Sequence, residues 1–333
     1  MSEKSVAWLK HVLLGLVGSA IGIGYGLACR KFFGNFASDR SDQVPVFAIM
    51  SLSFLLIVPM ALGFFYVWFL RGERKWLLAV FGPWIPATIM TLFTMVLQME
   101  GLICVVFAAP VVLCMSTVGG IVAALIRDRV ATAGGKRLCV AVVALLPFAV
   151  APVESLRERA TEVRTVACSI DIQATPAQVW KQIRSVPRIA ESEQSYSWHH
   201  RLGFPRPTEA VLEGTGVGSV RYARFEGNLL FVEKVTEWEE NRRLSFSIKA
   251  DTVNIPPTTL DEHVTIGGPY FDVLHGTYWI EPLGPDRVRL HLSSDQRLAT
   301  GFNVYAGWWT EWVMHDLQDY ILRIIKARAE RDR

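Results

Sequence analysis

The sequence predicts a helical membrane region followed by a soluble α+β domain. Three observations support this division. The first half carries five long apolar runs, the stretch Val166–Ile183 changes from strand to helix periodicity, and the chain ends in a long amphipathic helix over Asn303–Arg331. We expect a membrane domain at residues 1–153, a connector at 154–163 and a soluble domain at 164–333.

The apolar runs predict transmembrane helices, because about 20 apolar residues are needed to cross a bilayer. Four runs reach this length, whereas the fifth is short and contains Pro147 and Pro152. We therefore expect four to five transmembrane helices. The runs are Val12–Ala28, Val44–Leu70, Trp76–Gln98, Leu102–Ile126 and Leu138–Val153.

Small residues recur every four positions in two of these runs, over Gly18–Gly26 in the first and over Ser116–Ala124 in the fourth. Small side chains at this spacing let helix backbones approach closely, so both stripes are predicted packing faces. Within the spans we find no ionisable group apart from Glu100, which lies in the short turn between the third and fourth runs. An ion path needs more such groups, so a transporter is not expected.

The basic residues of the connections predict the orientation. If the N-terminus is cytoplasmic, the connections on the cytoplasmic side carry nine Lys and Arg and those on the other side carry six. This excess favours an N-terminus in the cytoplasm. Five spans then place the soluble domain outside the cytoplasm, and four place it inside. We expect five spans, and hence an integral protein of the plasma (bacterial inner) membrane with an extracytoplasmic soluble domain.

Charge and cysteine content exclude several function classes. Up to Val153 there are 12 Lys and Arg against 6 Asp and Glu, whereas the rest has 22 against 25, so the soluble part is slightly acidic. A nucleic-acid partner is not expected, because it would need a basic face on the soluble domain. Cys168 is the single cysteine of that domain, and no CxxC or Cys/His pattern occurs, so we predict neither a metal nor a cofactor.

The soluble part opens with a charged stretch and a strand-to-helix junction. The stretch Glu154–Glu162 lacks Pro and Gly and predicts a short helical connector. Apolar residues then alternate over Val166–Ile172, as in a half-buried strand. Thr175 is a good N-cap, with Gln178 three residues later, and the helix that follows ends at Pro187.

This junction, with Ala174–Ala177 as its turn and Val179–Trp180 on its helix, resembles the opening of the START-like (SRPBCC) superfamily, which includes polyketide cyclase/dehydrase-type proteins. The segments Gly214–Phe225 and Val235–Phe246 also resemble that family, and the likeness covers roughly Arg164–Arg331. It implies a helix-grip fold, in which an antiparallel sheet wraps a long C-terminal helix around an apolar cavity. A hydrophobic small molecule or lipid is the partner that it implies.

The glycines at 214, 216 and 218 precede a strand, so they are expected at a turn and not at a nucleotide. The last two strands are predicted to pair with Ile280 opposite Val288 and Tyr278 opposite Leu290 on the apolar face. The polar face then carries His275 and His291.

The C-terminal helix is predicted to present one apolar face to the sheet, consisting of Ala306, Trp309, Val313, Leu317, Tyr320 and Ile324. Bulky aromatic residues on this helix either narrow the cavity or stack on a flat ligand, and core packing is the alternative. By resemblance, the expected cavity residues are Trp180, Trp198, Tyr222, Phe246, Tyr278, Trp308, Trp309 and Trp312.

Three functions stay open at this point. The first is a membrane-anchored binding protein for a hydrophobic small molecule or lipid. The second is a cyclase or dehydratase-type enzyme, whose acid/base group would come from His315, Asp316, Glu213 or Tyr222. The third is a regulatory or assembly module with a protein partner. For Asp261, Glu262 and His263 we expect a solvated loop, and for His199 and His200 no metal.

Overall fold

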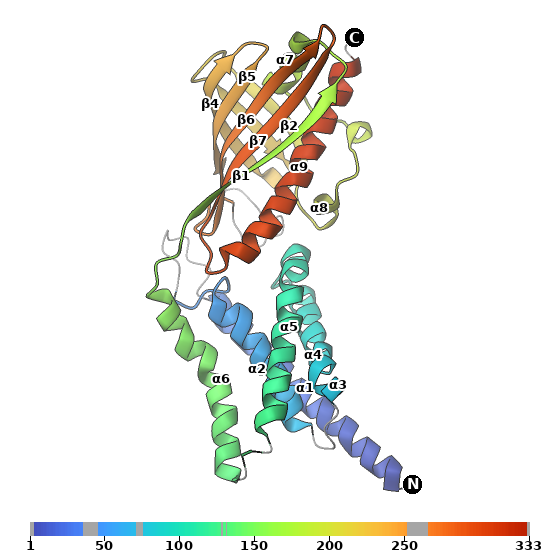
Figure 1. Cartoon of the computed structure of the whole chain (residues 1–333), viewed down its shortest axis with the longest axis vertical. Coiled ribbons are helices and arrows are strands. Elements are labelled where there is room, and N and C mark those ends of the chain that lie inside the picture. Colours follow the sequence, from blue (N-terminus) through green and yellow to red (C-terminus); the bar gives the residue numbers. More distant parts are fainter. Residues whose placement is uncertain are drawn as a thin grey trace. The chain divides into compact units, whose positions relative to one another are not determined.

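The structure, a computed structural model of the chain, describes residues 3–35, 46–70, 76–127, 129–130, 132–251 and 266–331. It consists of two compact units, Met1–Glu158 and Arg159–Arg333 (Figure 1). The first is helical and the second contains the sheet. The predicted loop residues Asp261, Glu262 and His263 lie outside the described residues.

The first unit is built from apolar helices that match the predicted runs in order. Among the described residues, four of its helices are long and apolar enough to cross a membrane, namely Leu13–Asn35, Trp76–Val96, Leu102–Ile126 and Ala133–Ser155. The elements are α1 (Glu3–Asn35), η1 (Ser53–Ile57), α2 (Val58–Phe69), α3 (Trp76–Phe81), α4 (Trp84–Val96), α5 (Leu102–Ile126) and α6 (Ala133–Ser155).

The prediction that the fifth run is the short one is wrong. The helix α6 has 23 residues, because it begins at the Thr132 N-cap, before the apolar run, and continues through Pro147 and Pro152. The shorter apolar helix comes instead from the second run, where Ser53–Phe69 is helical. Its residues are the most enclosed of the unit, since α2 packs on both α1 and α5.

The small-residue stripes are packing faces, as predicted. A Cβ added at Gly18 would lie 2.9 Å from the Tyr66 carbonyl oxygen of α2, and one added at Gly22 would lie 3.2 Å from that of Leu62. Across α2, Gly63 meets the backbone of Ser116 on α5. The helices of this unit therefore pack through backbone contacts that a larger side chain would prevent.

Two polar contacts join the ends of helices in this unit. Arg30, which the sequence placed in a connection, lies on α1, is 4% exposed and forms an ion pair with Glu100. Glu154 near the end of α6 accepts hydrogen bonds from the backbone N–H groups of Leu52 (2.7 Å) and Ser53 (2.9 Å). It thereby caps the start of the η1–α2 helix.

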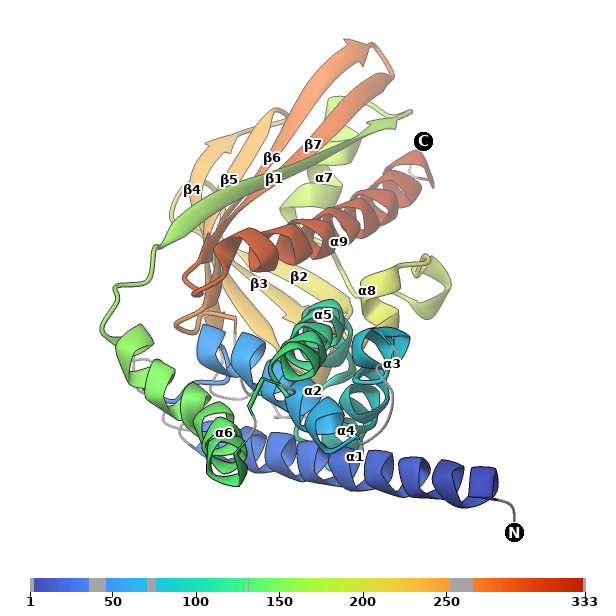
Figure 2. The same cartoon turned by 60° about the horizontal axis from the view of Figure 1, so that its bottom comes forward.

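The described residues of the second unit form a seven-stranded antiparallel sheet in the order β1-β7-β6-β5-β4-β3-β2. The sheet curves around the long helix α9 (Figures 1 and 2). This confirms the predicted helix-grip class. Its elements are β1 (Glu162–Ile172), α7 (Pro176–Arg184), η2 (Glu191–Glu193), α8 (Trp198–Arg201), β2 (Pro207–Glu213), β3 (Val220–Phe225), η3 (Glu226–Asn228), β4 (Leu230–Glu239), β5 (Arg243–Asp251), β6 (Phe271–Gly284), β7 (Arg287–Leu298) and α9 (Asn303–Arg331).

The junction between β1 and α7 is as predicted. The Thr175 side chain accepts from the Gln178 N–H, and the Gln178 side chain accepts from the Thr175 N–H, which is a complete capping box. The helical connector is wrong, however. The helix α6 ends at Ser155, and residues 158–161 have no regular structure before β1.

The predicted pairing of β6 with β7 has the right face and the wrong register. Ile280 lies opposite Leu290, and Tyr278 lies opposite Leu292, which is a shift of two residues. The turn was predicted over Leu283–Asp286, whereas β6 continues to Gly284 through an irregularity and β7 begins at Arg287, so the turn is tighter than predicted. A shift of two leaves every side chain on its predicted face, because strand side chains alternate with a period of two.

The helix α9 is packed on two sides, not on one face. Its sheet side includes Met314, Leu322 and Ile325, which lie in clusters with sheet residues. Another side meets the segment between α7 and β2, where Tyr320 contacts the His200 ring at 4.7 Å. The prediction of a single face is therefore wrong, because Leu317 of that face packs on the sheet whereas Tyr320 packs on the other segment.

Candidate functional site

The concave face of the sheet, which packs on α7 and α9, is apolar over most of its area. Leu244, Ile280 and Leu290 are fully buried there, in one cluster with Leu322 and Ile325 of α9. Burial of this many apolar side chains supplies the main stabilisation of the unit. Any charged group on this face is therefore removed from water.

Two charged side chains nevertheless lie on this face. Arg221 on β3 and Glu233 on β4 are cross-strand neighbours, and their side chains form an ion pair in which they are 4% and 8% exposed. The Arg221 guanidinium carbon lies 5.4 Å from the centroid of the Phe246 ring, and the guanidinium also hydrogen-bonds Tyr278. We call Arg221, Glu233 and Tyr278 the interior polar cluster.

Burial governs the ionisation of this cluster. Desolvation raises the pKa of Glu233 above its usual range, although the Arg221 charge acts to lower it. Burial also raises the pKa of Tyr278. For Arg221 burial acts to lower the pKa, but Glu233 and Tyr278 outweigh it, so that the pKa is raised. The cluster can thus present both a cation and a carboxyl group inside an apolar face.

The same face holds polar atoms without a hydrogen-bond partner among the described residues. They include Arg221 Nε and both amide atoms of Gln296, a residue of β7 that is 0% exposed. Gln318 on α9 donates to Val166 O and Ser294 Oγ, each at 3.0 Å, while its Oε1 has no partner. An unpaired buried polar group lowers the stability of the fold by about 1–3 kcal/mol, so a ligand group that hydrogen-bonded to it would bind favourably.

Three of the predicted cavity residues lie together in this interior. Trp180 on α7, Phe246 on β5 and Tyr278 on β6 are each 3% exposed and belong to one apolar cluster. Trp180 meets Trp238 edge-to-face at 5.1 Å, and Phe246 lies 6.1 Å from Tyr278. Phe246 packs on Arg221, and Tyr278 is itself a member of the interior polar cluster, so these two rings lie at the cluster.

The remaining predicted tryptophans form a separate group outside that interior. Trp198 stacks on Trp312 at 3.7 Å, and Trp309 lies 5.4 Å from Trp312 and 5.7 Å from Trp308. Trp308 and Trp312 are 68% and 48% exposed. This group covers the first third of α9, so the predicted aromatic set divides into two places.

Tyr222 and Glu213 lie on the other face of the sheet. Tyr222 alternates with the buried Arg221 and Ala223 on β3, so its side chain is on the opposite side. Glu213 is exposed and pairs with Val220, which shares the face of Tyr222. Neither residue joins the interior polar cluster.

Asp316 belongs to a polar network with Ser197 and His199, which does not have the geometry of a catalytic triad. Asp316 Oδ2 accepts from Ser197 Oγ at 2.6 Å and from the His199 N–H at 3.2 Å, and it also pairs with His199 Nδ1. Ser197 Oγ lies 2.7 Å from the same ring nitrogen. A catalytic triad needs the hydroxyl and the carboxylate on opposite ring nitrogens, so this arrangement holds α8 on α9 instead.

His199 and His200 are both buried, with exposed fractions of 1% and 9%. Burial lowers the pKa of His199, against the influence of Asp316. Burial, followed by the neighbouring His199, lowers the pKa of His200 to about 4. Directly before Asp316 on α9, His315 Nδ1 lies 3.1 Å from Cys168 Sγ, and burial raises the pKa of that thiol to about 12. Cys168 is therefore a poor nucleophile.

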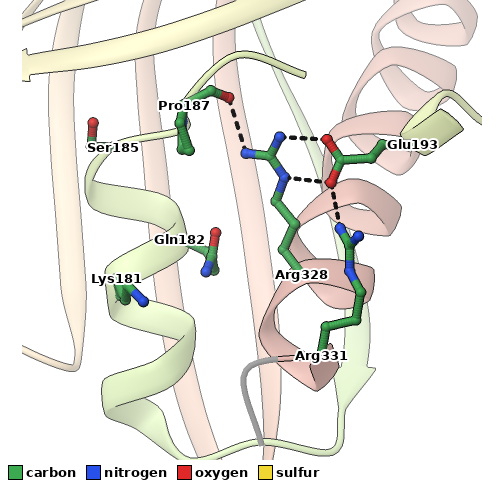
Figure 3. A pocket seen from close by; sticks show the side chains of 7 residues that line it. All are labelled: Lys181, Gln182, Ser185, Pro187, Glu193, Arg328 and Arg331. Carbon is green, nitrogen blue, oxygen red and sulfur yellow. Dashed lines mark hydrogen bonds and ion pairs between the residues drawn. The ribbon is translucent and has the colours of Figure 1, made fainter. Parts of the chain in front are cut away.

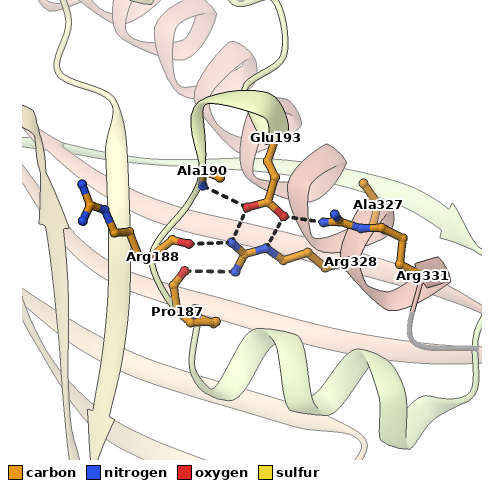
Figure 4. Close-up of polar contacts among 7 residues, drawn as sticks. All are labelled: Pro187, Arg188, Ala190, Glu193, Ala327, Arg328 and Arg331. Atoms are coloured by element: carbon orange, nitrogen blue, oxygen red, sulfur yellow. Dashed lines mark hydrogen bonds and ion pairs between the residues drawn. The ribbon is translucent and has the colours of Figure 1, made fainter.

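A second arginine–glutamate cluster closes the other end of α9. Arg328 donates its Nε and Nη2 to Glu193 at 3.0 and 2.6 Å, and it donates to the carbonyls of Pro187 (3.0 Å) and Arg188 (3.1 Å) (Figure 4). Arg331 also pairs with Glu193. We call Glu193, Arg328 and Arg331 the C-terminal clamp.

The clamp borders a polar pocket of about 300 Å³ between α7 and the end of α9 (Figure 3). Hydrogen bonds keep the Glu193 carboxylate ionised here. The bond from Arg328 is the largest influence, and together with those from Ala190 and Arg331 it lowers the pKa of Glu193 to about 2. The pocket is not the predicted apolar cavity. It is lined by Lys181, Gln182, Ser185, Pro187, Glu193, Arg328 and Arg331.

Sequence reasoning missed Arg221 and Glu233, although a signal was present. On β3 the side chain of Arg221 lies on the same face as those of Ala223 and Phe225. On β4 the side chain of Glu233 lies on the same face as those of Phe231 and Val235. A charged residue in step with apolar neighbours on each of two adjacent strands indicates an inward-facing pair. The prediction instead placed Tyr222 inward, on the other parity of β3.

No protein-family model matches the chain, and no curated protein sequence matches it. Similar solved structures include the ZhuI aromatase/cyclase from Streptomyces sp. R1128, at 15% identity and a TM-score of 0.34, over 51% of this chain and 95% of that one. A START superfamily protein from Mycobacterium smegmatis has 12% identity and a TM-score of 0.34, over 51% and 99%.

Norcoclaurine synthase from Thalictrum flavum has 15% identity and a TM-score of 0.29, over 50% of this chain and 87% of that one. The Mycobacterium smegmatis protein is described as a member of the START superfamily, which the sequence resembles. At such identities the likeness concerns the fold alone.

Proposed function

We propose that the chain is a membrane-anchored binding protein for an apolar small molecule or lipid with one polar group. One observation carries this proposal: the interior polar cluster lies in an apolar face and leaves Arg221 Nε without a partner among the described residues. A buried ion pair recovers its desolvation cost only when its remaining hydrogen bonds are made. A ligand oxygen at Arg221 Nε would complete the set.

The chemistry of the site defines the ligand class. An acceptor such as a carboxylate, carbonyl or hydroxyl oxygen suits Arg221, and Glu233 or Tyr278 can hydrogen-bond a second polar atom. The rings of Phe246 and Trp180 suit an apolar body. The proposed site needs no metal or cofactor.

The N-terminal helices support the membrane part of the proposal. Four of them have the length and composition of transmembrane helices. Anchoring keeps the binding domain beside the bilayer, where a poorly soluble ligand is concentrated. The extracytoplasmic position of this domain stays a prediction, which requires that the η1–α2 helix also crosses.

The test is native extraction of the full chain, followed by mass spectrometry of the bound small molecules. The informative variant is Arg221→Met with Glu233→Leu, because removing both charges leaves no unpaired buried ion and should not prevent folding. The matched control is Arg224→Met with Glu209→Leu, an ion pair of 3.0 Å between β3 and its other neighbour β2, whose side chains are 50% and 31% exposed. We expect the wild type and the control to carry the same ligand, and the interior variant to lose it.

An interior variant that folds and retains the ligand in full would refute the proposed site. A wild-type chain that is recovered empty from its native membrane would refute the function.

A second candidate, acid–base catalysis, is favoured by the raised pKa of Glu233, because a general acid or base in an apolar site needs a pKa shifted toward the working pH. In the same experiment, Glu233→Gln would then carry a molecule of different mass from the wild type, namely the substrate in place of the product.

A further inference from the structure

The first third of α9 exposes an apolar stripe. Val304, Trp308 and Trp312 follow one another every four residues and are 85%, 68% and 48% exposed. Residues four apart lie on one face of a helix. The same face is polar further along, where His315, Asp319 and Arg323 are exposed. We call Val304, Trp308 and Trp312 the tryptophan face.

Hydrogen bonds hold this part of α9 next to the start of the soluble unit. Asn303 Nδ2 donates to the Ala160 carbonyl at 2.7 Å. Arg164 on β1 joins Glu311 at 2.8 Å and Glu162 at 2.9 Å. The position of the tryptophan face is therefore fixed relative to the point where the chain enters the soluble unit.

That entry point is close in sequence to the end of α6, which finishes at Ser155. The five residues from there to Ala160 span at most about 18 Å when fully extended. If α6 crosses the bilayer, its end lies at the membrane surface, and the start of α9 lies within reach of that surface. The apolar part of the exposed face is thus the part that is bonded next to the point where the chain enters the soluble unit.

We infer that the tryptophan face lies in the headgroup region of the bilayer that holds the N-terminal helices. Tryptophan suits this region because its ring is apolar and its N–H finds polar partners there. The stacking of Trp198 on Trp312 makes the face rigid, so little side-chain freedom is lost on insertion. The inference rests on the proposed membrane anchoring and adds a second attachment to it.

The test places a photo-crosslinking benzophenone amino acid at single positions of the full chain in phospholipid nanodiscs. Position 308 reports on the tryptophan face. Position 279 is the matched control, since Trp279 is 39% exposed on the outer face of the sheet. Position 145 reports on anchoring, because Leu145 lies within α6 and is 64% exposed. Mass spectrometry then identifies what each position has captured.

We expect lipid adducts at positions 145 and 308, and several-fold fewer at position 279. Capture of peptides from α1–α6, or of a second copy of the chain, at position 308 would overturn the inference, because another surface would then cover the face. Equal lipid capture at positions 308 and 279 would overturn it as well. Absence of lipid at position 145 would refute the anchoring itself, whereas lipid at 145 and none at 308 would refute the inference alone.

Discussion

The interior polar cluster and the C-terminal clamp are both built from arginine and glutamate, but they differ in how completely the arginine is bonded. In the clamp, Arg328 donates to Glu193 through two nitrogens and to the carbonyls of Pro187 and Arg188. In the interior, Arg221 leaves its Nε without a partner among the described residues. The hydrogen bonding of the arginine is therefore complete at the end of α9 and incomplete on the concave face of the sheet.

This difference separates a structural role from a functional one. The clamp joins the end of α9 to the segment after α7, and its bonds to backbone carbonyls fix that segment in place. The interior cluster joins strands that the sheet already holds together. Its charges add little to the fold, and under the proposed function a ligand completes their hydrogen bonds.

The largest effect is expected for Arg328→Ala. This change removes four hydrogen bonds and leaves Glu193, which is 13% exposed, without its main partner. Breaking such a buried pair costs about 3 kcal/mol, which lowers the unfolding midpoint of a domain of this size by roughly 6–12 °C. Tryptophan fluorescence of the full chain during heating in nanodiscs measures this midpoint.

The matched control for that experiment is Arg331→Ala. Arg331 also pairs with Glu193, but its side chain is 61% exposed. An exposed ion pair contributes about 0.5 kcal/mol or less, so the midpoint should change little. Equal losses in the two variants would mean that the backbone contacts of Arg328 do not stabilise the domain.

Double variants compare the two clusters directly. Arg221→Met with Glu233→Leu should leave the unfolding midpoint unchanged, or raise it by the equivalent of up to about 2 kcal/mol, because desolvated charges are replaced by apolar groups. Arg328→Met with Glu193→Leu should lose about 2 kcal/mol, since the backbone groups of Pro187, Arg188 and Ala190 lose their partners. The same heating experiment serves for both.

The comparison would be wrong if the interior double variant were the less stable of the two. The interior ion pair would then be a structural element, and the proposed ligand would lose its main support.

The sequence predicted best what is determined locally. The capping box of Thr175 and Gln178 depends on residues three apart, and it is present in the structure. The order of strands and helices, and the faces of β6 and β7, also follow from short-range periodicity. Together with the resemblance of the Val166–Ile183 junction to the START-like superfamily, these local patterns allowed the helix-grip class to be predicted.

What the sequence could not determine depends on contacts between distant elements. The register of β6 and β7 shifted by two because the turn at Gly284 is tighter than the predicted one. The helix α9 is amphipathic on more than one side, so a single face could not be chosen from spacing alone. The inward-facing residues of β3 were misassigned at Tyr222 because each of the two alternating sets of residues on this strand contains an aromatic ring. The pairing of Arg221 with Glu233 could be recognised only with knowledge of the β3–β4 register.

The smallest expected effect is a change in pH dependence for Glu193→Gln. Arg328, with Ala190 and Arg331, lowers the pKa of Glu193 from 4.5 to about 2 in the folded chain, so its carboxylate stabilises the fold above pH 4.5. This contribution is lost as the pH falls from about 4.5 to about 2. The unfolding midpoint of the wild type should therefore fall across this window more steeply than that of the variant, whose amide does not titrate. Glu233, whose pKa burial raises, has the opposite sign, because its protonation at lower pH favours the folded state. Parallel pH curves for the wild type and Glu193→Gln would show that the clamp acts through its neutral hydrogen bonds and not through its charge.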